Sequence, residues 1–351
     1  MLAIDGSYGE GGGQLLRTAV SLAAVTGAAI RVHSIRAKRK PPGLAPQHLA
    51  AIRAASELCR GRLEGAALRS QEITFVPGHI EGGTYTFDIG TAGSITLLLQ
   101  ALLPMMVSAQ QPFAIRVSGG ADVRGAPPFD YFSHVFMPAL SMLGASATAT
   151  LRRRGYYPRG GGLVEMTVSP GDLKPLTIDR PGQLLELGGI AHVSRLPLSI
   201  AERMRASALA SLAGLYAPEH CAAIAVQEES AIGAGGAIVL WARLEHSVLG
   251  AGRVAERGVP AERLGSDSGA ALRADLMAHT TFDVHAADQI LVYLALALAA
   301  GPSHFTVREV SSHAQTGMWL IEQLLPARFS VEPRDGHIRI HVSRRAHGVD
   351  W

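Results

Sequence analysis

The chain has 351 residues, of which 48% are hydrophobic and 17% are charged, and its formal net charge is +3. This balance is typical of a globular protein rather than a disordered one, and the length suits about two domains of roughly 100 to 200 residues each. The two cysteines, Cys59 and Cys221, form no C-x-x-C pair, so neither a disulfide framework nor a thiolate zinc site has support. We expect a cytoplasmic protein without membrane contact, because the first residues lack a signal-peptide pattern and no apolar run approaches about 18 residues.

Two units of similar pattern fill the first half of the chain. In both, apolar residues alternate in short segments and recur at helical spacing in longer ones, which predicts the order strand, helix, strand, helix, strand. The first unit comprises residues 2–5, 11–27, 28–35, 42–59 and 72–78, and the second comprises 84–89, 92–109, 113–120, 127–144 and 163–170. Glycine and proline mark the joins between these segments.

A third unit of this kind is predicted near the C-terminus, after a stretch of about 100 residues with a different pattern. The third unit shows helix, strand, helix and strand patterns at 285–301, 304–310, 312–326 and 337–343. The intervening stretch shows strand patterns at 187–195, 221–229 and 237–244, helix patterns at 199–216 and 260–277, and a glycine turn at 233–236. We therefore expect an α/β (α+β) fold of three tandem β-α-β-α-β repeats, formed by residues 1–183 and 277–351, with a smaller α/β domain inserted at 184–276.

The glycine-rich segment "GSYGEGGGQLLR" at 6–17 fits neither G-x-x-x-x-G-K-[ST] nor G-x-G-x-x-G. It still predicts a turn that opens a helix, whose free N–H groups can receive an anion, although a plain tight turn remains equally compatible. Glu10 is suited to a metal ion that bridges phosphates, and Arg17 is suited to a phosphate oxygen.

A lysine nucleophile is disfavoured, because none of the three lysines lies in the K-x-D-G pattern of nucleotidyl-transferring ligases. The fourteen histidines form no H-E-x-x-H motif, so histidine chemistry would come from a single ring. His313 precedes an apolar helix pattern, and from its position alone it is more simply a cap or core residue than a catalyst.

The segment "IRAKRKPPGLAPQHL" at 35–49 is the best candidate for a phosphate-binding loop. Arg36 and Arg39 offer fork-shaped donors, and Gln47 begins a predicted helix behind them. We expect His48 to be a structural neighbour, and the arginine runs at 152–154 and 344–345 to be solvated loops.

Seven segments in order resemble one known family, the RNA 3'-terminal phosphate cyclases. They are "DGSYGEGGGQLLR", "IRAKRKPPGLAPQH", "GTAGSITLLLQ", "GGADVRGAPPFDY", "GYYPRGGG", "HAADQ" and "SSHAQTGMWLIEQLLP", and they span nearly the whole chain. The resemblance implies that each repeat is similar to the C-terminal domain of translation initiation factor three, with the smaller domain inserted in the last part. This agrees with the repeat pattern.

The resemblance also implies a ligase reaction in three steps. ATP adenylylates a histidine, AMP passes to the 3'-phosphate of an RNA end, and the neighbouring 2'-OH then forms a 2',3'-cyclic phosphate and releases AMP. A divalent cation, Mg²⁺ or Mn²⁺, would neutralise the triphosphate. The implied partners are ATP and RNA with a 3'-phosphate end, and the oligomeric state is open between monomer and homodimer. The low aromatic content of 5% and the lack of a recognisable sequence-reading module indicate that the RNA is bound by its terminus rather than by its base sequence.

Matched by position, the resemblance makes His313 the nucleophile. It places Gln100, His285, Ala286, Ala287, Asp288 and Gln289 in the adenine-nucleotide pocket, with His285 stacking on the base, although a plain helix start with polar caps would also explain Ala286 and Ala287. Glu10 would contact the metal or the triphosphate, and Arg17, Arg36, Arg39 and Gln47 would hold the RNA terminal phosphate or the ATP tail. Trp319 is expected to pack in the core, and the "GYYPRGGG" tyrosines fit either an RNA path or a packed turn.

The sequence departs from the family pattern at two of these positions. Gly317 stands where asparagine is common, and His285 stands where tyrosine is common. The main rival to an active cyclase is a non-catalytic, cyclase-like RNA-binding protein of ribosome assembly, but such proteins lack the nucleophilic histidine, and His313 with "HAADQ" counts against this. An enolpyruvyl transferase would share only a related repeat architecture.

Overall fold

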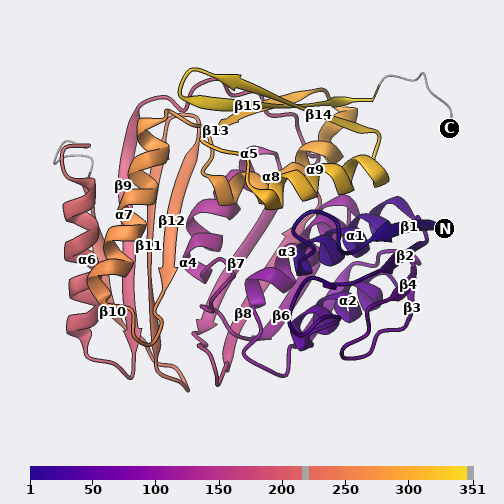
Figure 1. The fold of residues 1–351 in the computed structure, drawn as a ribbon, viewed down its shortest axis with the longest axis horizontal. Helices are drawn as coiled ribbons and strands as arrows, with labels where there is room; N and C mark the ends of the chain where they lie inside the picture. Colours follow the sequence, from indigo (N-terminus) through magenta and orange to yellow (C-terminus); the bar gives the residue numbers. More distant parts are fainter. Residues whose placement is uncertain (216–220, 346–351) are drawn as a thin grey trace.

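The computed structural model describes residues 1–215 and 221–345 (Figure 1). Within these ranges the chain forms four small sheets and the helices that cover them, a mixed α/β fold as predicted. None of the helices in these ranges has the length and apolar character needed to cross a membrane.

The first two units share one topology. The first consists of β1 (Leu2–Asp5), α1 (Gly13–Thr26), β2 (Ile30–His33), α2 (Pro46–Leu58), β3 (Arg62–Glu64) and β4 (Ile73–Val76). The second consists of β5 (Gly83–Asp88), α3 (Ile95–Ser108), β6 (Phe113–Gly119), α4 (Phe129–Tyr131), η1 (Phe132–Phe136), α5 (Met137–Met142), β7 (Ser146–Arg153) and β8 (Gly162–Ser169), where η1 is a π-helical turn. The strand orders are β1-β2-β4-β3 and β5-β6-β8-β7, so each unit has one more strand, at the sheet edge, than the predicted five-element repeat.

The third unit follows the same order once its first strand is found before the insertion. It consists of α8 (Val284–Leu296), η3 (Ala297–Ala299), β13 (Ser303–Val307), α9 (Ser312–Leu324), β14 (Ala327–Arg334) and β15 (His337–Arg344), with strand order β13-β15-β14. Thr177 pairs with His304 in parallel, and His304 N–H donates to Leu176 O at 2.8 Å. Residues 176–178 therefore take the place that β1 and β5 hold in the other units, and the insertion separates this strand from α8.

The inserted segment has its own sheet and its own core. It consists of β9 (Leu184–Ser194), α6 (Leu198–Leu212), β10 (Cys221–Glu228), β11 (Gly235–Leu244), β12 (Val248–Val254) and α7 (Ala261–Met277), with strand order β10-β9-β11-β12. Strand β12 was not predicted, and the last residue of the predicted helix at 199–216 lies outside the described residues. One hydrophobic cluster lies between this sheet and its helices α6 and α7. The prediction that residues 184–276 fold as a separate domain stays a prediction.

Helices from all three units pack together in the middle of the molecule, and the sheets lie outside them (Figure 1). Helix α1 contacts α3 and α9, and α8 also contacts α3 and α9. The apolar faces predicted from the sequence meet in this layer and form one large buried cluster. The N-termini of α1, α8 and α9, which carry most of the predicted site residues, are held by this packing.

Candidate active site

His313 is the second residue of α9, and its ring meets the loop between β1 and α1. Ser311 caps the helix by accepting a hydrogen bond from Ala314 N–H at 2.9 Å. The His313 Nδ1 atom lies 2.5 Å from Glu10 Oε2 and also contacts Gln14 Oε1. Because both partners are acceptors, the proton belongs on Nδ1, and the lone pair of Nε2 is left free.

The charge state of the ring supports this tautomer. Burial lowers the pKa of His313 below its usual value of 6.5, and the nearby positive charges act in the same direction, while the Glu10 carboxylate opposes them. The neutral imidazole is therefore the main form at pH 7. The side chain remains 45% exposed, so the ring can be reached from outside.

The loop at 6–12 approaches α9 closely because of its glycines. Gly9 and Gly11 have φ values of +56° and +59°, in the left-handed region that favours glycine. A Cβ atom at Gly9 would collide with the Thr316 hydroxyl. This close contact brings the Glu10 carboxylate to both His313 and the Arg39 guanidinium.

A small cavity of about 60 Å³ lies between α1, α3, α8 and α9. Its lining includes Gln14, Arg17, Gln100, Asp288 and Gln289, and the Gln100 amide donates to the Gln289 side chain. Thus the structure brings together four predicted site residues from three helices. Gln14 was not predicted, although it lies one helical turn before Arg17 on the same face of α1, a spacing that could have revealed it.

Two groups in this cavity have shifted pKa values. Burial lowers the pKa of Arg17 to about 10. Its guanidinium therefore stays charged at neutral pH, although it is shielded from water. Burial raises the pKa of Asp288 to about 7, and the charges of Asp283 and Glu10 add to this, while the Ser311 hydroxyl opposes it by donating at 2.6 Å. A buried cation and a carboxyl group with a raised pKa in one cavity are common properties of ligand sites.

Residues from "HAADQ" divide into two groups. Asp288 and Gln289 line the cavity, and the exposed His285 is near enough to His313 to lower the pKa of that ring. In contrast, Ala286 and Ala287 are 0% and 2% exposed and point into the core. Their backbone N–H groups donate to Asp283, as expected of an ordinary helix start, so their predicted contact with nucleotide has no support from this geometry.

The predicted phosphate-binding residues gather at the start of α2. Arg36 donates through Nη1 to Gly43 O at 2.7 Å, which closes its own loop, and Arg39 pairs with Glu10. His48 is buried, and burial together with Arg17 and Arg36 lowers its pKa to about 3. His48 is therefore neutral and lies near the charges of Arg17 and Arg36, in agreement with its expected structural role.

Gln47 stands between the first and second units. It begins α2 and packs against the loop before α3, where a Cβ atom at Gly93 would lie 2.9 Å from Gln47 Cβ. The N-terminal ends of two helices therefore meet near this amide, which is a favourable place for an anion.

Asp283 was not predicted as a site residue, although an acidic residue just before an apolar helix pattern is a capping signal. Its carboxylate caps α8 by accepting from the backbone N–H groups of His285 and Ala286, both at 3.0 Å. It also accepts from Tyr131 Oη at 2.6 Å and from Gly250 N–H at 3.0 Å. A single buried carboxylate thereby connects α8 to the second unit and to β12 of the inserted segment.

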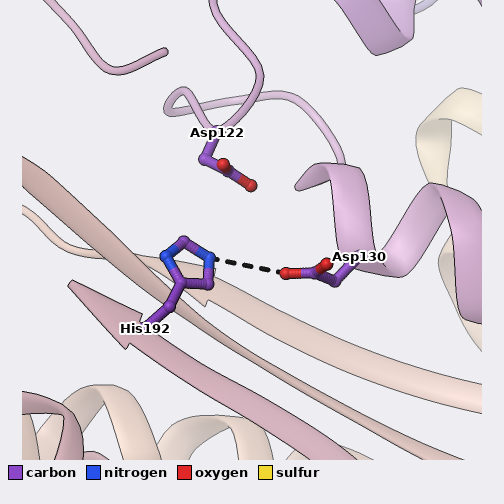
Figure 2. Close-up of side chains that lie close together, drawn as sticks. All are labelled: Asp122, Asp130 and His192. Carbon is purple, nitrogen blue, oxygen red and sulfur yellow. Dashed lines mark ion pairs between the residues drawn. The ribbon is translucent and has the colours of Figure 1, made fainter. Parts of the chain in front are cut away.

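A second cluster of charged groups is buried away from His313. Figure 2 shows His192 of β9 facing Asp130, with Asp122 beside them. Their ligand atoms lie within 4.8 Å of one another, but the buried Arg154 reaches Asp122 at 3.2 Å and Asp130 at 2.9 Å and supplies positive charge there. Tyr156 is 2% exposed and contacts His192, so this tyrosine belongs to a packed turn.

Comparisons with known proteins give a consistent result. A family model described as RNA 3'-terminal phosphate cyclase matches residues 8–331. Proteins named RNA 3'-terminal phosphate cyclase from Nitrosospira multiformis and Methanosarcina barkeri are 51% and 42% identical to this chain, over 99% and 98% of it and over 98% and 100% of their own lengths. A protein of the same name from Pyrococcus furiosus is 40% identical over 99% of this chain and all of its own length.

Similarity of this extent defines the class of protein as an enzyme, a ligase. The chain belongs to the RNA 3'-terminal phosphate cyclase family. The resemblance found in the sequence is thereby confirmed, and the non-catalytic alternative loses its support.

Proposed function

We propose that this protein uses ATP to convert an RNA 3'-terminal phosphate into a 2',3'-cyclic phosphodiester by way of a covalent adenylate on His313. The main support is the pair of acceptors on His313 Nδ1, Glu10 and Gln14, which leaves Nε2 unprotonated and free to attack. The names of relatives at 40–51% identity support the cyclisation of an RNA 3'-terminal phosphate, and the adenylate on His313 rests on the geometry of the ring.

The first step forms a bond between His313 Nε2 and the α-phosphorus of ATP and releases pyrophosphate. In the second step an oxygen of the RNA 3'-phosphate attacks the same phosphorus, the bond to His313 breaks, and the ring regains its lone pair. The ribose 2'-oxygen then attacks the 3'-phosphorus, loses its proton and expels AMP. AMP makes a better leaving group than an oxygen of the phosphate monoester itself, which explains the need for two activation steps.

The residues around His313 have distinct tasks in this proposal. Asp288, Gln289 and Gln100 would bind the adenosine in the cavity, with His285 over the base, and Arg17 would meet phosphate oxygens from inside the cavity. Arg36, Arg39 and Gln47 would hold the RNA phosphate or the ATP tail from the loop side. The lowered pKa of His313 keeps the ring neutral and available.

Glu10 would hold Mg²⁺ or Mn²⁺ that arrives with ATP, and the ion would neutralise phosphate charge. Mg²⁺ is commonly bound by one or two carboxylates together with substrate phosphates and water, so a single carboxylate at this position fits. The Glu10 oxygens face Arg39 and His313, on the side where the triphosphate would lie.

The proposal is tested with a short RNA that ends in a 3'-phosphate. We expect ATP-dependent conversion to a phosphatase-resistant 2',3'-cyclic end, with release of AMP and pyrophosphate, and no conversion by His313→Ala. Arg39→Ala should impair RNA conversion more than self-adenylylation. Cyclic ends formed without ATP, or conversion that survives His313→Ala, would refute the proposed mechanism.

A further inference from the structure

Two rows of side chains on α9 begin at His313 and diverge. His313, Gly317 and Ile321 are four residues apart, and the last two line the cavity that contains the predicted nucleotide-binding residues. His313, Thr316 and Trp319 are three residues apart and face the loop at 6–12. Because residues three and four apart lie on neighbouring strips of a helix, the two rows lead from His313 to two different places, the cavity and the loop at 6–12.

Three consecutive loop residues follow the second row. Glu10 contacts His313, and its backbone N–H donates to Thr316 Oγ1 at 3.4 Å. Gly9 lies against the same Thr316. Tyr8 stacks on Trp319 with ring centroids 3.8 Å apart and an interplanar angle of 15°. The stacked Tyr8 and Trp319 thus lie at the far end of a row of contacts that begins at His313.

Tyr8 is the solvent-exposed member of the stacked pair and lies beside basic side chains, whereas Trp319 is half-buried against the core, as expected from the sequence. Tyr8 is 41% exposed, although one face of its ring is covered by Trp319. Lys38 Nζ donates to Gly9 O at 3.4 Å, and Arg39 pairs with Glu10. An exposed ring next to flexible cations is the usual composition of a single-stranded nucleic acid site, because every base has a face that can stack.

We propose that Tyr8, supported from behind by Trp319, is a stacking platform for a base near the 3' end of the RNA, while the terminal phosphate lies at His313. Six residues of α-helix rise about 9 Å, so the platform lies within a few nucleotides of the reacting phosphate. The inference rests on the proposed function, but it assigns the RNA to the Tyr8 side and leaves the cavity side to ATP. It also gives the rings a role that does not depend on base identity.

The test measures binding of RNA oligonucleotides that end in a 3'-phosphate, in the absence of ATP. One set has all its bases, and a second set has a single abasic nucleotide at one of the last four positions. We expect Tyr8→Ala to weaken binding of the intact RNA by roughly 5- to 100-fold, whereas Tyr8→Phe, which keeps the ring, should bind like the wild-type protein. Tyr8→Leu keeps apolar bulk against Trp319 and should bind like Tyr8→Ala.

The abasic set separates stacking from loop packing. In the wild-type protein one abasic position should cost about as much binding as Tyr8→Ala, and in Tyr8→Ala that same position should cost nothing further. If Tyr8→Ala and Tyr8→Leu bind RNA like the wild-type protein, or if the abasic penalty persists in Tyr8→Ala, the ring only holds the loop and the platform is wrong. Self-adenylylation of the wild-type protein with labelled ATP is measured in a separate assay. Missing label would contradict the proposed function, whereas the RNA-binding ratios test only the stacking platform.

Discussion

At the scale of single residues, the site depends on which nitrogen of His313 carries the proton. Glu10 and Gln14 both accept at Nδ1, and burial disfavours a second proton on the ring. Glu10 has two opposing effects, because its charge raises the pKa of His313 while its oxygen fixes the tautomer. These effects can be separated by pH.

The rate of self-adenylylation should fall as the pH drops through the pKa of His313, which lies below the usual 6.5. Glu10→Gln retains an acceptor oxygen but removes the charge, so the pKa should fall further and the acid limb should move to lower pH. The measurement is the pH profile of the initial labelling rate, normalised to its own plateau. An acid limb that moves to higher pH in Glu10→Gln would contradict this account of the electrostatics.

In the absence of nucleotide, ionisation of the Asp288 carboxyl group should lower the free energy of unfolding. Its pKa of about 7 exceeds the ordinary 3.8, so the folded state loses stability as pH rises from about 4, and the loss is complete above about pH 7. Asp288→Asn has no charge and can still accept from Ser311. Since one pKa unit corresponds to about 1.4 kcal/mol, the variant should gain up to about 4 kcal/mol above pH 7 and little near pH 4.

This prediction is checked by denaturant unfolding at several pH values without ATP. The advantage of Asp288→Asn should grow between about pH 4 and pH 7 and then level off. A constant difference across this range would mean that Asp288 does not titrate as described.

At the scale of elements, α8 is positioned by Asp283. This residue caps the helix that carries Asp288 and Gln289, and it also binds Tyr131 and the backbone of β12. The inserted segment therefore contacts the element that lines the cavity through one carboxylate.

Asp283→Asn should lower the free energy of unfolding by about 2 kcal/mol, because the amide group would turn a donor toward a buried donor. The KM for ATP in self-adenylylation should rise more than kcat falls, since the helix moves but His313 is untouched. Tyr131→Phe is the matched control, because it removes one of these hydrogen bonds and keeps the cap. Unchanged stability and unchanged KM in Asp283→Asn would show that α8 is positioned by packing alone.

The sequence predicted the helices and the inner strands well because their apolar residues are buried at regular spacing. It missed β3, β7, β12 and β14, which all lie at sheet edges. Strands β3, β7 and β14 carry mostly exposed residues, as in "SATATLRR" of β7, whereas the missed β12 is largely buried. The interrupted helix at 127–144 was predicted as one helix, because a π-helical turn leaves the apolar spacing nearly unchanged. The first strand of the third unit was missed because only three residues, 176–178, mark it ahead of a long insertion.

At the scale of the whole molecule, the site joins segments that are about 300 residues apart. Glu10 and Gln14 meet His313 only because α1 packs against α9, and no local pattern contains that contact. His313 itself could be proposed from the family resemblance. Its tautomer, its partner Gln14 and the role of Asp283 required the fold.

The inserted segment is attached to the second unit by buried charges. Arg154 reaches Asp122, Asp130 and Glu229, while His192 of β9 faces Asp130 (Figure 2). Arg154 is 3% exposed, so the prediction of a solvated loop at 152–154 is wrong for this residue. Its loss would leave carboxylates buried without a counter-charge.

Arg154→Leu should therefore cost about 3 to 5 kcal/mol of unfolding free energy. Arg152→Leu is the matched control, because Arg152 lies two residues away and forms an exposed pair with Glu165, which contributes about 0 to 1 kcal/mol. Denaturant unfolding of both variants gives the comparison. Equal and small losses of unfolding free energy in the two variants would show that the buried charges do not attach the inserted segment to the second unit.

In the proposed mechanism, His313 Nε2 carries AMP. The direct measurement incubates the full chain with ATP labelled at the α-phosphate and with Mg²⁺ or Mn²⁺, and then maps the label by peptide mass spectrometry and by its stability to acid and alkali. We expect an acid-labile, alkali-stable adduct on His313, which is absent from His313→Ala. Label on another residue, or undiminished label on His313→Ala, would contradict it.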